Sequence, residues 1–342
     1  MSRLVDVHSH IYPRRYVEWL KLRSTPPRVT EDSGGEFFVI FDEEEEAGPR
    51  GGRPFDRTFT DLEEKLAFMA RHGISRTVVS VGNPWLDPFT GRDGLDRAMD
   101  LNDELAGYER RTDGRIVALG VLPATDVRDA VAVAVEVAKA PALHGVVIGR
   151  RVAGRLLDDP RLDPLWEVLQ EQPTPVLVHP HDSVGQEQMT GFGHGLPVAL
   201  GFPFETTIAV SRLVMAGVLM RFPRLRLIVS HGGGTLPYLA GRLDSGWRSD
   251  PVLRDRLPYP PSRDLRKLYL DAIVFHERAL RAAGDLVGSD HLVYGTDHPF
   301  SIADPGANAR ALEAVYTNTD RGLVTHLTAE AIFGLAAAPH SP

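Results

Sequence analysis

The feature that most constrains the fold is an alternation of short apolar runs with helical patterns. Eight runs rich in β-branched residues are bounded by turn residues, at 4–7, 77–81, 116–121, 145–148, 175–178, 225–230, 268–272 and 292–294. Most are nearly continuous in apolar character, as expected of parallel strands covered on both faces. Between them, apolar residues recur every three or four positions, as in amphipathic helices. These segments are 61–73, 101–110, 130–139, 164–170, 205–220, 236–243, 277–286 and 307–316.

Eight strands alternating with about eight helices predict an α/β fold of the (β/α)₈ TIM barrel type. A doubly wound open sheet is the alternative, but no Gly-x-Gly-x-x-Gly motif follows the first strand. Because one such barrel takes about 250 residues or more, we interpret residues 1–342 as a single barrel domain.

Two stretches interrupt the alternation. Residues from about 14 to 58 contain a β-like run at 37–41 and an acidic run at 43–46. They predict a small insertion after the first strand, with a short antiparallel ribbon and a solvated acidic loop. Residues 181–203 form a second long loop, rich in glycine and proline, in which His194 is a candidate substrate contact. Long loops inside compact domains are usually functional or mobile.

The amino-acid composition excludes several kinds of reactive site and binding partner. The chain has no cysteine, which excludes disulfides, thiolate metal sites and cysteine nucleophiles and leaves 13 histidines and the carboxylates. A formal net charge of −8 without a basic block argues against nucleic acid as a partner. No apolar run approaches the roughly 20 residues that span a bilayer, and no signal peptide is recognisable, so we expect a cytoplasmic protein that binds no membrane.

Histidine and aspartate side chains follow the ends of four predicted strands. His8 and His10 end the first, His179 the fifth, His231 the sixth, and Asp297 the eighth. Barrel enzymes assemble their sites at these carboxyl ends, and residues two apart on a strand face the same side. Imidazole and carboxylate groups suit Zn²⁺ or a similar divalent ion, which can activate water. The pattern therefore predicts a metal site at one mouth of the barrel.

The motifs around these residues identify a resemblance that covers nearly the whole chain. They are VDVHSH at 5–10, VHP at 178–180, FETT at 204–207, SHGGG at 230–234, PYLAGR at 237–242 and YGTDHPF at 294–300. The chain resembles the amidohydrolase-related metal-dependent decarboxylases, most of all the aminocarboxymuconate semialdehyde decarboxylase type. The resemblance implies a barrel, one divalent metal ion (commonly zinc) and cleavage of a carbon–carbon bond with release of CO₂.

The resemblance also implies roles for individual residues. It makes His8, His10, His179 and Asp297 the metal ligands, and it makes His231 the acid/base beside them. Asp297 is thereby part of the catalytic group as well. The substrate-binding residues that we expect are Arg242 and Arg53, together with His298 and Phe300 from their places beside Asp297. His298 either lines the site or orients a neighbouring residue, and Phe300 is either a pocket wall or a buried core aromatic.

Two arginines are expected to bind carboxylate. Arg242 matches an arginine that reaches the substrate in relatives, in some of them across a dimer interface, so the resemblance implies a homodimer. Arg53 falls near a second carboxylate-binding arginine in the insertion, and Arg50 and Arg57 compete for that role.

The sequence departs from the family pattern at three points. His298 stands where a tyrosine is expected, and Val198 where a bulky aromatic is expected. No lysine ends the fourth strand, so a carbamate-bridged binuclear centre has no bridging residue. These differences bear on the substrate more than on the class of reaction.

The leading hypothesis is a metal-dependent, non-oxidative decarboxylase of a small unsaturated or aromatic carboxylate. One alternative is a hydrolase or hydratase that acts on a lactone or enol with the same activated water. A further alternative is a non-catalytic metal-binding protein. Zn²⁺ is the first choice of ion, although nitrogen and oxygen ligands also accept Mn²⁺, Co²⁺ or Fe²⁺.

Overall fold

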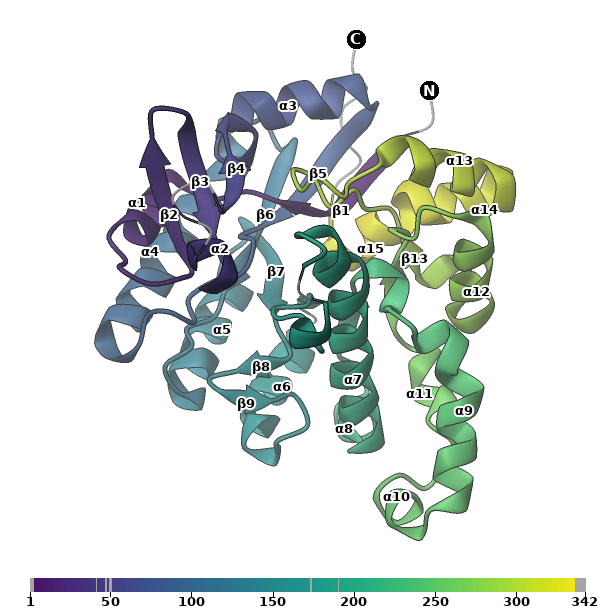
Figure 1. Cartoon of the computed structure of the whole chain (residues 1–342). Helices are drawn as coiled ribbons and strands as arrows, with labels where there is room; N and C mark the ends of the chain where they lie inside the picture. The colour runs from purple at the N-terminus through teal and green to yellow at the C-terminus, as the bar shows by residue number, and fades with distance from the viewer. Residues whose placement is uncertain are drawn as a thin grey trace.

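The central sheet has eight parallel strands in the order β1-β5-β6-β7-β10-β11-β12-β13 (Figure 1). The computed structural model describes residues 3–335 apart from positions 41, 47, 49, 50, 173 and 190. Val7 N donates to Tyr294 O at 2.9 Å, so the first and last strands meet and the sheet is a nearly closed barrel. All eight predicted strands are confirmed. They are β1 Leu4–His10, β5 Ile74–Ser80, β6 Ile116–Val121, β7 Leu143–Ile148, β10 Pro175–Val178, β11 Arg226–Val229, β12 Tyr269–Asp271 and β13 Leu292–Val293.

Helices surround this sheet and bury their apolar faces against it (Figure 1). The eight predicted helical segments are all present. They are α3 Leu62–Arg71, α4 Gly91–Arg111, α5 Val127–Lys139, α6 Asp163–Glu171, α7 Phe202–Met215 followed by α8 Val218–Arg221, α9 Leu236–Ser249, α12 Glu277–Val287 and α13 Pro305–Val315. Shorter helices α10 Pro251–Arg256, α11 Ser262–Leu265, α14 Asn318–Gly322 and α15 Thr328–Phe333 lie in the second half of the chain, and a small hairpin, β8 Arg151–Val152 and β9 Arg155–Leu156, follows β7. Gly73 follows α3 with a φ of +67°, the left-handed conformation expected of a glycine that ends a helix.

The insertion after β1 contains the expected antiparallel ribbon, extended to three strands. These are β2 Arg28–Asp32, β3 Gly35–Val39 and β4 Arg53–Phe55, preceded by helix α1 Arg14–Lys21. The acidic run was predicted wrongly as a solvated loop. It forms helix α2 Asp42–Glu46, and the side chain of Glu44 is only 5% exposed. The carboxylate of Glu44 accepts a hydrogen bond from Ile40 N and pairs with His194.

An aromatic cluster attaches the insertion to the barrel. Tyr12, just after β1, lies against Phe38, Phe55 and Phe59 with ring centroids 5.5, 5.4 and 6.1 Å away. Such edge-to-face contacts add to the apolar burial. The cluster fixes β4 and the residues after it at the carboxyl ends of the barrel strands.

One stretch corrects the expectation that no segment approaches membrane-spanning length. Pro197–Met215, which includes α7, has 19 residues and a mean hydropathy of 1.3. By length and composition alone it could cross a bilayer. Half of it is buried inside the protein, as in a barrel helix, so this finding is weak support for a membrane span.

Candidate metal centre

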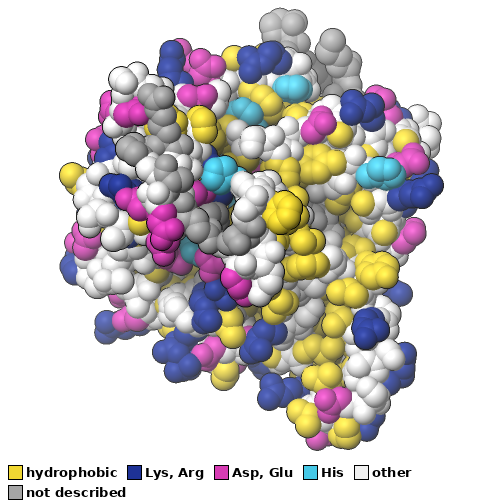
Figure 2. Space-filling model, in the orientation of Figure 1, with side chains coloured by type: hydrophobic (Ala, Val, Ile, Leu, Met, Phe, Trp, Pro, Cys, Tyr) yellow, Lys and Arg dark blue, Asp and Glu magenta, His cyan; other side chains and the backbone are white. Residues whose placement is uncertain are grey.

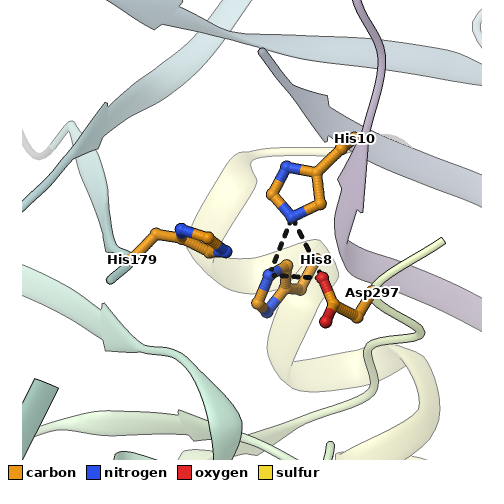
Figure 3. Close-up of side chains that lie close together, drawn as sticks. All are labelled: His8, His10, His179 and Asp297. Atoms are coloured by element: carbon orange, nitrogen blue, oxygen red, sulfur yellow. Dashed lines mark hydrogen bonds and ion pairs between the residues drawn. The ribbon is translucent and has the colours of Figure 1, made fainter. Parts of the chain in front are cut away.

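Four buried side chains converge at the carboxyl ends of the strands (Figure 3). They are His8 and His10 of β1, His179 after β10 and Asp297 after β13, and their ligand atoms all lie within 4.8 Å of one another. The Nε2 atoms of His8 and His10 are 3.1 Å apart. Asp297 Oδ1 is 3.2 Å from His10 Nε2 and 3.5 Å from His8 Nε2. The predicted convergence is therefore present in the fold.

The other ring nitrogen of each histidine has a partner outside the cluster. The contacts are His8 Nδ1 with Asp271 Oδ2 at 2.6 Å, His10 Nδ1 with Ser80 Oγ at 3.1 Å, and His179 Nδ1 with Pro180 O at 2.7 Å. When Nδ1 carries the proton, the Nε2 lone pair is free for a cation. Three such lone pairs then face the centre of the cluster.

Burial and charge set the protonation of these histidines. Burial lowers the pKa of His10 to about 4 and holds the pKa of His179 well below its ordinary value, so both rings are neutral at pH 7. Burial also opposes a proton on His8, but the hydrogen bond and charge of Asp271 outweigh it and raise the pKa of His8. Neutral imidazole is the form that binds metal ions.

Asp297 supplies the negative charge of the cluster. Burial opposes its ionisation, but contacts with His10 and His231 outweigh burial and hold the pKa of Asp297 well below the usual range. Its Oδ1 atom is buried and accepts no well-formed hydrogen bond from the residues that the structure describes. A bound cation would satisfy a buried carboxylate oxygen in that state. Three imidazole nitrogens and this oxygen fit one divalent metal ion.

Asp271, at the end of β12, was missed by sequence reasoning. Its Oδ2 atom contacts His8 Nδ1 and accepts from His231 N at 2.9 Å, and its Oδ1 accepts from Gly232 N at 2.9 Å. One carboxylate thus orients a candidate metal ligand and the turn that carries the candidate acid/base. The signal in the sequence was a lone carboxylate at the end of an apolar strand.

We expect Asp271→Asn to weaken metal binding by about 10- to 100-fold, the usual effect of losing a partner that orients a metal ligand. An amide can present an N–H group to His8 Nδ1, which disfavours the tautomer that leaves Nε2 free. Competition with a chelator measures the change. Asp264→Asn is the matched control, because Asp264 is equally buried but pairs with Lys267 at 2.6 Å. Equal affinity in the two variants would contradict the orienting role.

His231 lies between the cluster and the open space beside it. Its Nε2 is 3.5 Å from Asp297 Oδ2, and its Nδ1 makes no hydrogen bond within the described chain. His231 has a φ of +54°, and the glycines after it allow close packing, since a Cβ at Gly232 would clash with Val274. The turn after β11 therefore places the partly exposed imidazole of His231 next to the candidate metal ligands.

A cavity of about 500 Å³ opens onto this group. His179, His231 and Asp297 line it on one side. The remaining wall is largely apolar, with Phe59, Val198, Phe202, Pro299, Phe300 and Ile302, and carries polar groups from Arg53, Asn83 and His194. This is the composition of a small-molecule site.

Arg53 and Phe300 are both brought to the cavity, as the sequence predicted. The ring of Phe300 lies 5.1 Å from that of His10. Of the two competing arginines, Arg57 pairs with Asp61 on the surface, and Arg50 lies outside the described residues.

Two other predicted substrate contacts are not in the cavity wall. Arg242, on α9, is exposed, and its guanidinium group makes no hydrogen bond or ion pair with the residues that the structure describes. His298 turns away from the cavity, because its ring stacks on Phe68 at 3.7 Å and its Nδ1 lies 2.6 Å from Lys65 Nζ. His298 follows Asp297 directly in the sequence, but its side chain points away from the cavity that Asp297 lines.

Comparison with known proteins places this fold and site in a family. The model of the amidohydrolase family matches residues 5–335. The chain belongs to the amidohydrolase family. This amidohydrolase is 28% identical over 342 residues to 2-amino-3-carboxymuconate-6-semialdehyde decarboxylase of Dictyostelium discoideum, which covers 94% of this chain and 89% of the relative.

Solved structures share the fold. IDCase of Metarhizium anisopliae in its apo form is 32% identical, with a TM-score of 0.92 and coverage of 98% of both chains. 5-Carboxyvanillate decarboxylase of Novosphingobium aromaticivorans, complexed with manganese, is 22% identical, with a TM-score of 0.80 and coverage of 98% of this chain and 96% of the other. The predicted barrel is therefore confirmed for this amidohydrolase.

Proposed function

We propose that this amidohydrolase is a metal-dependent, non-oxidative decarboxylase of a small unsaturated or aromatic carboxylate. The observation that carries the proposal is the buried His₃Asp cluster, which opens onto a largely apolar cavity that is also lined by Arg53 and by the partly exposed ring of His231. The decarboxylases among its relatives support this choice of reaction.

We propose zinc as the ion, held by His8, His10, His179 and Asp297, because three imidazoles and one carboxylate are ligands that zinc accepts. Manganese is the second candidate, since the 5-carboxyvanillate decarboxylase structure is complexed with it. When bound, the ion supplies a Lewis acid that stabilises negative charge on substrate oxygen.

The side chains of the cavity would bind the substrate and supply a proton. Arg53 binds a carboxylate of the substrate through charge-assisted hydrogen bonds, while Phe59 and Phe300 enclose the planar part. The bond between the carboxyl carbon and its neighbour breaks, CO₂ leaves, and the electron pair stays on that neighbour. His231 Nε2, held beside Asp297 Oδ2, donates the proton that this carbon takes up.

A panel of unsaturated and aromatic carboxylates together with lactones tests the reaction class. The protein loaded with zinc or manganese is incubated with each compound, and both CO₂ release and lactone opening are followed. We expect CO₂ from at least one carboxylate. Lactone opening without CO₂ release would replace the proposal with hydrolysis, the alternative that the family name favours.

We also propose a homodimer in which Arg242 serves the neighbouring site. Arg242 lies four residues after Tyr238 on α9, and Tyr238 is 87% exposed. Exposed apolar side chains recur at Leu200, just before α7, and at Phe204 and Ile208 on α7, and Figure 2 shows hydrophobic groups over this region of the surface. A second copy packed on this surface would bury them and give Arg242 a partner.

Mixing two inactive variants tests this arrangement. Arg242→Ala and His179→Ala each remove one part of the site, so mixed dimers should carry one complete site and regain activity above either parent. A guanidinium is always charged and binds carboxylate in bidentate fashion, so it can act from across an interface. A monomer by light scattering, or subunit exchange without rescue, would show that Arg242 does not act in trans.

A further inference from the structure

Lys65 of α3 is a fully buried lysine next to the candidate metal centre. Its Nζ lies 2.8 Å from Ser9 Oγ, 2.6 Å from His298 Nδ1 and 3.2 Å from His298 O. An ammonium group has three protons to donate, and these three acceptors satisfy all of them. A buried charge is tolerated only with such partners, so the contacts are specific features of the fold.

The carbonyl oxygen of His298 is the point where the segments that carry metal ligands meet. Besides Lys65, it accepts hydrogen bonds from His10 N at 2.7 Å and from Ser9 Oγ at 3.1 Å. His298 directly follows Asp297, and Ser9 lies between His8 and His10 in the sequence. The contacts of Lys65 therefore reach the segments that hold three of the four candidate ligands.

The turn at Asp297 needs such support. Asp297 has a φ of +62°, a left-handed conformation that is unfavourable for a residue other than glycine and persists only when its surroundings fix it. On the outer side of the turn, the ring of His298 stacks on Phe68 with an interplanar angle of 25°. Lys65 and Phe68 are one helical turn apart on α3, so together they hold both the backbone and the ring of His298.

We propose that Lys65 is a positioning residue of the metal centre, which fixes His298 and thereby directs Asp297 Oδ1 toward the Nε2 atoms of His8 and His10. The inference rests on the metal site of the proposed function. Lys65 acts through His298 and Ser9.

A positioning role and a purely electrostatic role for Lys65 predict opposite changes in metal affinity when the lysine is replaced. A positive charge near a divalent cation repels it, so removing that charge alone would tighten metal binding. Removing the hydrogen bonds that hold the Asp297 turn would weaken binding. The sign of the change therefore separates positioning from charge.

Lys65→Met tests the inference, because methionine fills similar space without charge or donors. Burial lowers the pKa of Lys65 to about 7 against the charges of Asp6 and Asp297, so metal binding is measured below that pH, where the amine is protonated. We expect the zinc dissociation constant to rise about tenfold or more, the scale of losing a residue that orients a ligand. The visible spectrum of the Co²⁺-loaded protein should also change. Lys139→Met is the control, since Lys139 is 61% exposed and pairs with Glu136 on the surface.

Unchanged or tighter zinc binding in Lys65→Met, with the wild-type Co²⁺ spectrum, would overturn the inference. Should Lys65→Met fail to fold, Ser9→Ala tests the same contacts from the strand side. It should weaken zinc binding by a smaller factor, and wild-type affinity in that variant would overturn the inference as well. A wild-type protein that binds neither zinc nor cobalt would instead overturn the metal site of the proposed function.

Discussion

Replacing His8 with alanine is expected to remove most of the bound metal and, with it, the decarboxylase activity. His8 is fully buried, its Nε2 faces His10 and Asp297, and its Nδ1 is fixed by Asp271. Alanine removes one of the four donors, and the three donors that remain hold the ion more weakly. Metal analysis after dialysis should fall from about one equivalent per chain to a small fraction of that.

His291→Ala is the matched control for this experiment. His291 precedes β13 and lies at the end of that strand opposite to Asp297, where its ring stacks on Tyr269 at 4.6 Å. Its removal should leave metal content unchanged. Full occupancy in His8→Ala would reject the assignment of the ligands.

Replacing His231 with alanine should leave the metal in place while turnover falls by about 10²- to 10⁴-fold, the usual scale for a general acid or base. His231 lies in the cavity wall beside Asp297, and its Nδ1 has no hydrogen-bond partner in the part of the chain that the structure describes. Metal content and steady-state turnover are measured on the same sample. Wild-type turnover would exclude the acid/base role, and loss of the metal would make His231 a ligand.

The sequence was sufficient for the barrel because its strands carry an unusual signal. Parallel strands that are buried on both faces are continuous apolar runs, and most of the eight predicted strands are nearly continuous in this way. The helices were located less well where their exposed turns are polar. Helix α4, for example, begins at Gly91, well before the apolar spacing that starts at residue 101.

The candidate ligands could be predicted because barrel geometry brings strand ends together, whatever their separation in the chain. The residues that support these ligands could not be predicted from the sequence. His8 meets Asp271 across 263 positions, and Lys65 meets His298 across 233. Such pairs depend on strand register and on how a helix packs against the barrel, and neither can be predicted from a local sequence pattern.

Two residues lie where local patterns could not place them. His298 was expected to line the cavity or to orient a neighbour, and the left-handed turn at Asp297 directs its ring away from the cavity to Phe68. Glu44 belonged to a run of acidic residues, which is usually solvated. Its carboxylate is instead held between Ile40 N and His194, a contact between the insertion and the loop at 181–203.

The most direct test of metal-dependent decarboxylation follows a carboxylate substrate from the panel in heavy water, with the metal-free protein and then with zinc restored. We expect a product that has lost one CO₂ and gained one deuteron on the carbon that carried it, formed only when about one equivalent of metal is present. A product that retains its carboxylate and takes up oxygen from ¹⁸O-labelled water, or equal CO₂ release without metal, would exclude this reaction.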